Sequence, residues 1–392
     1  MSQGVLSIGA VVIVLALSSF LNPNEFGGTR YLIAVFAILS FFSLPGVGSV
    51  VINHLPLLNR RGLWHGIVAQ IRWGLGATVG ALLIAVYYLG FTVDNNDLAF
   101  GFLVGGVLAP VANLYLMPGT VLAGLKRFKA KMLVDGLIIA LTAGGAAYGA
   151  SATQTITGTI LCYYATQLLL TAVALLLVIR LLPAHAAERS HRSTTDVRYG
   201  KQLTFFQVPF TLLPSLEKAF VFILLGPTAL AVFAIAVIPA EHMKNAVRNL
   251  LQFYMLPHLK ERGAGTWVFD VKKWFTLSTG LSVVATAALL LAVFFLMPIL
   301  FPHYESAHAL AVILSFTVLL LPFQVFTVSW VAAQRVGTLF TYAFSVVLIN
   351  VLTFVFLLPL LGLQGAIVAK IVFEILAASV AVVLHFGRNG FS

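Results

Sequence analysis

The sequence is a series of long apolar segments separated by short polar loops. Each segment holds about 20 mostly apolar residues, the length that an α-helix needs to cross the hydrocarbon core of a bilayer. The apolar runs are too long, and alternate too little, for the strands of an outer-membrane barrel. The pattern therefore predicts an all-α integral membrane protein with about twelve transmembrane helices. The predicted spans are residues 4–21, 30–53, 71–92, 98–122, 132–151, 155–180, 202–225, 228–256, 275–299, 307–333, 337–358 and 363–386.

Positive charge alternates from one loop to the next along these spans. Most of the 23 Lys and Arg residues lie in the loops after the even-numbered spans and in the C-terminal tail. The loops after the odd-numbered spans hold no Lys or Arg. Because Lys and Arg gather in cytoplasmic loops, the alternation predicts that both termini are cytoplasmic. The loops on the other side carry acids instead, namely Glu25, Asp94, Asp97 and Glu305.

The longest polar stretch divides the chain into two halves of six spans each. Residues 183–201 follow the sixth span and predict a cytoplasmic linker. The predicted domains are an N-terminal six-helix bundle, residues 1–182, and a C-terminal six-helix bundle, residues 202–392. The halves share a short echo, because residues 22–38 and 226–238 each place a proline-containing turn before a helix with the sequence AVFAI. Parallel repeats are common in transporters, although a chance match between two apolar runs explains the echo equally well.

The composition agrees with a membrane protein and argues against other classes. The chain is 60% hydrophobic and 9% charged, whereas a soluble domain carries about a quarter charged residues. The net charge of +11 is explained by basic loops that face the cytoplasm and anionic lipid headgroups, rather than by nucleic-acid binding. The single cysteine, Cys162, excludes an intramolecular disulfide and a CxxC metal site. No HExxH, GxSxG, GxxxxGK[ST] or DxD motif is present, so we expect a protein that is not an enzyme and has no metal or cofactor.

A few charged residues lie within the predicted spans. A charge at the bilayer centre costs roughly 2.5–3.5 kcal/mol on insertion scales, so such residues face protein or a water-filled cavity. Arg30, Arg72 and Asp135 lie near the ends of spans, where interfacial anchoring explains them. The others lie deeper in the spans, and they identify the spans that contain candidate functional residues. The deep acids are Glu217, Glu241 and Glu374, and the deep basic residues are Lys218, Lys244, Arg248 and Lys370.

The eighth span carries its polar residues on a single helical face. Their spacing of i, i+3, i+4, i+7 and i+11 brings neighbouring side chains together along one stripe. A helix face in contact with lipid could not carry such a stripe, so the face lines a polar interior or a cavity. The residues of the stripe are Glu241, Lys244, Asn245, Arg248 and Gln252.

Two interpretations of the deep charges remain open. In the first, the charges neutralise each other as buried pairs, for example Glu217 with Lys244, and Lys370 with Glu374. In the second, they line a solvated central path, which is favoured because buried pairs stabilise a fold poorly compared with apolar residues. The surplus of basic residues then suits an anionic headgroup such as a phosphate or a pyrophosphate.

Several stretches resemble a known transporter family in their order and spacing. They are LNPNEFGGTRYLIAVFAI after the first span, LEKAFVFILLGPTALAVFAIA at 216–236, QFYMLPHLKE at 252–261 and LPLLGLQGAIVAKIVFEI at 358–375. Together they resemble the O-antigen-type, Wzx-like polysaccharide flippases of the multidrug/oligosaccharidyl-lipid/polysaccharide (MOP) exporter superfamily. The resemblance covers nearly the whole chain and agrees with its layout of six plus six helices.

The resemblance implies a fold, a function and partners. It implies two helical bundles around a central cavity and a transporter that works by alternating access. The implied activity moves a polyprenyl-pyrophosphate-linked oligosaccharide, a polysaccharide repeat unit, from the inner to the outer leaflet of a bacterial inner membrane. A proton or sodium gradient drives this movement, and the implied partners are membrane lipids, a polysaccharide polymerase and chain-length machinery.

The resemblance also implies roles for the deep polar residues. Basic residues of the cavity bind the pyrophosphate, acids couple transport to the cation gradient, and uncharged polar residues face the sugars. The implied pyrophosphate ligands are Lys218, Lys244, Arg248, Arg30 and Lys370. The implied coupling acids are Glu217, Glu241 and Glu374. The implied sugar-facing residues are Asn113, Tyr115, Asn245, Gln252, Gln324 and Asn350.

Three alternative functions compete with the flippase. A cation-coupled small-molecule or drug exporter of the same fold needs an acidic, aromatic cavity, so the basic surplus argues against it. A membrane polymerase or ligase acting on the same lipid-linked sugars usually carries a large external loop, and every predicted outer loop here is short. A scaffold without transport activity does not explain the deep charges.

Overall fold

In the residues that the computed structural model describes, all of the regular secondary structure is helical. Each predicted span coincides with helix in these residues, which confirms the predicted all-α fold. The seventh predicted span is described only from residue 212 onward. The structure describes residues 2–43, 60–91, 96–182, 212–262, 267–333 and 335–389.

Contacts between residues divide the chain into two compact units. The N-terminal unit is Met1–Ser215 and the C-terminal unit is Leu216–Ser392, and each is described here by itself. The predicted linker, residues 183–201, lies outside the described residues. The predicted central cavity stays a prediction.

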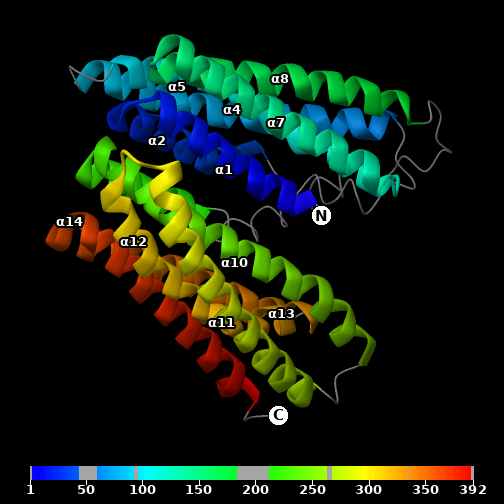
Figure 1. Ribbon diagram of the computed structural model, residues 1–392. Helices are drawn as coiled ribbons and strands as arrows, with labels where there is room; N and C mark the ends of the chain where they lie inside the picture. The colour runs from blue at the N-terminus through cyan, green and yellow to red at the C-terminus, as the bar shows by residue number, and fades with distance from the viewer. Residues whose placement is uncertain are drawn as a thin grey trace. The chain divides into compact units, whose positions relative to one another are not determined.

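The N-terminal unit is a bundle of long helices (Figure 1). Helix α7 packs against α1 and α8, and α5 contacts both α4 and α8. Helix α2 contacts α4, α5 and α8. The elements are α1 (Ser2–Phe20), α2 (Pro23–Leu39), η1 (Ser40–Ser43), α4 (Arg60–Phe91), α5 (Asn96–Ala112), η3 (Asn113–Leu116), α6 (Met117–Gly124), α7 (Phe128–Thr153) and α8 (Ile156–Arg180).

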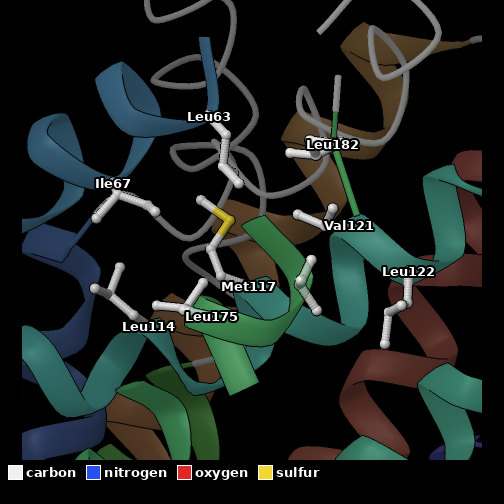
Figure 2. Packing of buried hydrophobic residues seen from close by; sticks show 9 residues of the cluster. Leu63, Ile67, Leu114, Met117, Val121, Leu122, Leu175 and Leu182 are labelled. Atoms are coloured by element: carbon white, nitrogen blue, oxygen red, sulfur yellow. The ribbon is translucent and has the colours of Figure 1, made fainter. Parts of the chain in front are cut away.

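A cluster of leucines and other apolar residues joins α4, η3, α6 and α8 (Figure 2). Leu63 of α4, Met117 of α6 and Leu182 after α8 are each at most 3% exposed. Lipid tails are as apolar as leucine, so burial from water contributes little here. Close van der Waals packing is what holds such helices together.

The start of α2 differs from the prediction. Residues 22–29 were predicted as an outer loop, but α2 begins at Pro23. Asn22 caps the helix, because its side chain accepts a hydrogen bond from the Glu25 amide at 2.9 Å. Proline suits the first turn of a helix, where its missing N–H costs nothing. Arg30 is therefore the eighth residue of α2, about 10 Å from its start, and does not lie at a helix end.

The fourth and tenth predicted spans are each interrupted by a short 3₁₀ segment. In the N-terminal unit, η3 separates α5 from α6. Pro110 lies just before this break and Pro118 just after it. In the C-terminal unit, η6 separates α12 from α13 and contains Pro322. Proline removes a backbone donor and clashes with the preceding turn, so the regular α-helical ladder cannot continue through these points.

The C-terminal unit contains the remaining helices (Figure 1). Helix α10 packs against α11 and α12, α11 contacts η6, and α13 contacts α14. Residues 212–225 form the first helix of this part of the chain. The other elements are α10 (Pro227–Arg262), α11 (Trp267–Leu300), α12 (Glu305–Ser315), η6 (Phe316–Phe323), α13 (Gln324–Ala332) and α14 (Val336–Asn389).

Helix α14 is two helices joined at Gly362. This residue has φ 59° and ψ −135°, a backbone conformation that glycine adopts readily and other residues avoid. The turn separates the last two predicted spans, residues 337–358 and 363–386. Both of them are helical.

The described residues form a multi-pass membrane protein. Nine helices in this part of the chain are long and apolar enough to cross a bilayer, and one of them is the bent α14. Large apolar side chains point away from the protein along these helices, for example Leu83, Leu291, Phe294 and Leu360. A soluble protein rarely exposes so much contiguous apolar surface, whereas lipid accommodates it.

A partly buried carboxylate at the start of α8 links α8 to α5. The carboxylate of Asp97 on α5 accepts hydrogen bonds from the amides of Ile156 at 2.6 Å and Thr157 at 3.1 Å. The Thr157 hydroxyl also donates to the Asp97 carbonyl oxygen at 2.8 Å. A carboxylate at a helix N-terminus satisfies free amides and interacts favourably with the helix dipole. Asp97 therefore joins α5 to α8, although it lies 60 residues before Thr157 in the sequence.

We expect Asp97→Ala to lower the free energy of unfolding by about 2 kcal/mol, because two helix-terminal amides lose a charged acceptor. The measurement is thermal unfolding of the purified protein in detergent micelles. Glu305→Ala is the matched control, because Glu305 also lies in a first helical turn but is exposed and does not cap the helix. The control should change the stability by no more than about 0.5 kcal/mol. Equal effects of the two variants would contradict the role of the cap.

Candidate functional site

The deep charges of the C-terminal unit lie near one another in three bonded sets, which we together call the charge network. It draws side chains from the helix at residues 212–225, from α10 and from the two parts of α14, with α13 at its edge. Three of its ionic side chains are almost completely enclosed, Glu217 at 1%, Lys370 at 5% and Lys244 at 6% exposure. The network consists of Glu217, Lys218, Glu241, Lys244, Arg248, Lys370 and Glu374, with the amides Asn350 and Gln324.

Glu217 and Lys370 form the centre of the network. The Lys370 ammonium donates to Glu217 Oε2 at 2.5 Å and to Glu241 Oε1 at 3.3 Å. The second oxygen of Glu217 accepts a hydrogen bond from Asn350 Nδ2 at 2.9 Å. One ammonium thus bridges carboxylates from two other helices. Such full pairing is what a buried ion needs to offset its lost hydration.

The outer part of the network is more open. Lys244 donates to Glu374 Oε1 at 2.6 Å, and Lys218 Nζ lies 4.0 Å from Glu241 Oε2. The side chains of Glu241 and Glu374 are 24% and 23% exposed. These two carboxylates are therefore partly open, whereas Glu217 is closed off.

Arg248 extends the basic side of the network along α10. Its Nε donates to Gln324 Oε1 on α13 at 2.7 Å. This bond uses one of the five N–H donors of the guanidinium. Gln324 follows directly after the 3₁₀ segment η6, so the break in the tenth span places this amide against Arg248. The bond orients a side chain whose planar fork suits phosphate oxygens.

The pairs suggested from the sequence are wrong in their partners. Glu217 pairs with Lys370 rather than with Lys244, and Glu374 pairs with Lys244 rather than with Lys370. Lys370 and Glu374 do share one face of α14, as their spacing predicted. Each of them instead reaches across to a neighbouring helix, where an opposite charge otherwise lacks a partner.

The structure brings some of the predicted sugar-facing residues into the network and leaves others outside it. Asn350 is completely buried and donates to Glu217. This position does not fit a sugar-facing role, because no part of its amide is open to a ligand. Asn245 is exposed on α10, and Gln252 lies on the same helix, but its side chain lies outside the described residues. Gln324 supports Arg248 from α13.

Three predicted site residues belong to the N-terminal unit. Arg30 lies in the middle of α2, and Asn113 and Tyr115 lie in η3. The Asn113 amide donates to the Ser43 hydroxyl at 3.2 Å, which links η3 to η1. All three side chains are half-buried.

A second buried carboxylate in the N-terminal unit was not predicted as part of a site. Asp135 of α7 is 4% exposed and accepts from Lys131 at 2.5 Å. Its carboxylate packs directly against the backbone of Gly119 in α6, where a Cβ atom would collide with it. The sequence interpretation of Asp135 as an interfacial anchor is therefore wrong. The i, i+4 spacing to Lys131 was the available signal.

No metal site is built from several protein ligands in the described part of the chain. In those residues, no group of three or more His, Cys, Asp or Glu side chains is placed to hold a metal ion. The cations of the charge network are the ammonium and guanidinium groups of its own lysines and arginine.

The comparisons with known proteins give the fold. No protein-family model and no curated protein matches the sequence. The lipid II flippase MurJ, in an inward closed conformation, has a TM-score of 0.68 at 11% identity, over 96% of this chain and 86% of MurJ. An outward-facing multidrug resistance MATE family transporter of the MOP superfamily has a TM-score of 0.59 at 14% identity, over 100% of this chain and 97% of that chain. A MOP superfamily transporter from Pyrococcus furiosus has a TM-score of 0.56 at 12% identity, over 99% of this chain and 93% of that chain. The chain therefore has the fold of the transporters of the MOP superfamily.

Proposed function

We propose that the protein is a transporter that flips a polyprenyl-pyrophosphate-linked oligosaccharide, a polysaccharide repeat unit. It moves this lipid from the inner to the outer leaflet of a bacterial inner membrane by alternating access, with both termini in the cytoplasm. A cation gradient drives the cycle. The flipped lipid then passes to a polysaccharide polymerase and chain-length machinery.

The charge balance of the network is the observation that carries this proposal. The network holds four cationic side chains and three carboxylates, an excess of one positive charge. Three of the cations, Lys244, Arg248 and Lys370, lie within helices long and apolar enough to cross a membrane, where a charge without a function is costly. Ammonium and guanidinium groups bind phosphate oxygens through short, charge-assisted hydrogen bonds. This excess of positive charge does not favour binding of a positively charged drug.

The more exposed members of the network suit contact with a headgroup. Lys218 is 4.0 Å from Glu241, a loose pairing that a phosphate oxygen can displace. Arg248 keeps donors beyond the one that Gln324 uses. Binding of a phosphate oxygen to Lys218 would weaken the attraction of this ammonium for Glu241 and make that carboxylate easier to protonate. This exchange gives a physical link between cation coupling and substrate binding.

The fold alone does not distinguish a flippase from an exporter. The similar structures include both a lipid II flippase and a multidrug resistance transporter. A drug exporter of the same fold is the alternative, and it predicts a different phenotype. The experiment below therefore measures both activities.

The test uses bacteria in which this gene is deleted. We expect lipid-linked repeat units to accumulate on the cytoplasmic leaflet and the surface polysaccharide to be lost, with both restored by the wild-type gene. The sidedness is measured by labelling the oligosaccharide in intact cells and in inverted vesicles. Normal surface polymer, together with increased sensitivity to cationic drugs, would reject the flippase in favour of the exporter.

A further inference from the structure

The Lys370 ammonium lies where a metal ion would lie between two acidic side chains. It is 2.5 Å from Glu217 Oε2 and 3.3 Å from Glu241 Oε1. The three residues come from three different helices: the helix at 212–225, α10 and the second part of α14. The ammonium thus connects these three helices through ion pairs.

A further buried oxygen belongs to Asn350, a residue bonded to Glu217. Asn350 is 0% exposed, and its Oδ1 is buried without a hydrogen-bond partner in the described residues. The Nδ2 of the same amide donates to Glu217, so this unused oxygen belongs to the immediate surroundings of the Glu217 carboxylate. Carboxylate and amide oxygens are the ligands that hard cations prefer. The surroundings of Lys370 therefore resemble a cation site that a side chain already fills.

We propose that Lys370 is a built-in cation that takes the place of a bound sodium ion, so that the C-terminal unit works without sodium. The charges support this assignment, because Lys370 and Lys218 together balance Glu217 and Glu241. An added sodium ion would place an uncompensated positive charge among buried groups, which is strongly unfavourable. The consequence for transport rests on the proposed function: of the two candidate coupling ions, the proton drives the cycle.

The decisive experiment asks whether removing this ammonium creates a need for sodium. The full-length protein is purified in detergent, and its melting temperature is measured in sodium chloride and in choline chloride at equal ionic strength. For the wild type we expect the same melting temperature in both salts, within about 1 °C. In choline chloride, Lys370→Ala should melt about 5–15 °C lower than the wild type, since it leaves two carboxylates without their cation.

Sodium should reverse much of this loss. Lys370→Ala removes the long side chain and leaves space between Glu217 and Glu241, with Asn350 bonded to Glu217. Glu241 is partly exposed, which gives ions a route to the site. We expect sodium chloride to recover at least half of the lost melting temperature, because a bound ion stabilises the folded state by mass action.

Three variants separate a sodium site from a general salt effect. Lys370→Met keeps the length of the side chain but not its charge, so it should be destabilised without a sodium response. The double variant, Asn350→Ala with Lys370→Ala, should gain less melting temperature from sodium chloride than Lys370→Ala alone. Lys131→Ala is the matched control, because it also frees a buried carboxylate, Asp135, that has no second acidic partner in its ion pair. It should show no difference between the two salts.

The outcomes decide the proposal in either direction. A wild-type protein that sodium stabilises overturns it. A Lys370→Ala variant that sodium does not stabilise, or that cannot be recovered even in sodium, also overturns it. The assay uses no transport substrate, so its result stands whether or not the flippase proposal succeeds. If the flipping experiment fails but the sodium response is as expected, only the proposed transport substrate is rejected.

Discussion

Glu217→Ala is expected to lower the free energy of unfolding by about 3–5 kcal/mol, the largest effect on stability that we predict. Glu217 is 1% exposed and holds both the Lys370 ammonium and the Asn350 amide. Its removal leaves Lys370 with a single, longer bond to Glu241 inside the protein. An insufficiently paired buried charge costs far more than the pair itself contributes.

Thermal unfolding of the purified protein measures this effect, and a double variant tests its cause. Glu217→Leu combined with Lys370→Met removes both charges and keeps the volume, so it should recover much of the stability lost by Glu217→Ala. Glu305→Ala is the control, because Glu305 is exposed and does not cap its helix, so its removal should cost no more than about 0.5 kcal/mol. A loss below about 1 kcal/mol for Glu217→Ala would contradict the buried pair.

Arg248→Ala is expected to reduce flipping by about 10- to 100-fold, the largest effect on activity that we predict. A hydrogen bond to a charged group contributes about 1.5–3 kcal/mol, and each 1.4 kcal/mol is a factor of ten. Gln324 holds the guanidinium in place through its Nε at 2.7 Å, which leaves the remaining donors for a pyrophosphate. The measurement is the fraction of lipid-linked oligosaccharide on the outer leaflet of deletion cells that express each variant at equal level.

Two further variants test whether Arg248 acts on the headgroup. Arg248→Lys keeps the charge but loses the planar fork, so it should restore only part of the activity. Gln324→Leu should impair flipping less than Arg248→Ala, since it only releases the guanidinium. Lys272→Ala is the control, because Lys272 is an exposed basic residue on α11, and it should flip normally. Full activity of Arg248→Ala would remove Arg248 from the proposed binding residues.

The helical character and approximate positions of the spans could be predicted from the sequence, but some of their boundaries could not. A helix in lipid makes all of its backbone hydrogen bonds within its own segment. The length and apolar character of a span can therefore be read from a local stretch of sequence. The start of α2 was missed although Asn22 and Pro23 form a helix-starting signal. Their polarity and the following glycines suggested a loop. The break at η6 depends on how Pro322 is accommodated by neighbouring helices, which no local pattern determines.

The sequence by itself determined which side chains carry the deep charge of the C-terminal unit. Helical spacing placed Glu241, Lys244 and Arg248 on one face of α10, and the cost of a charge in lipid marked the deep residues as exceptional. Only the tertiary structure decided their partners. Lys370 meets Glu217 across 153 positions of sequence, and Lys244 meets Glu374 across 130. Helical periodicity fixes the direction of a side chain about its own axis, whereas a pair also needs the packing of two distant helices, which arises only when the chain folds.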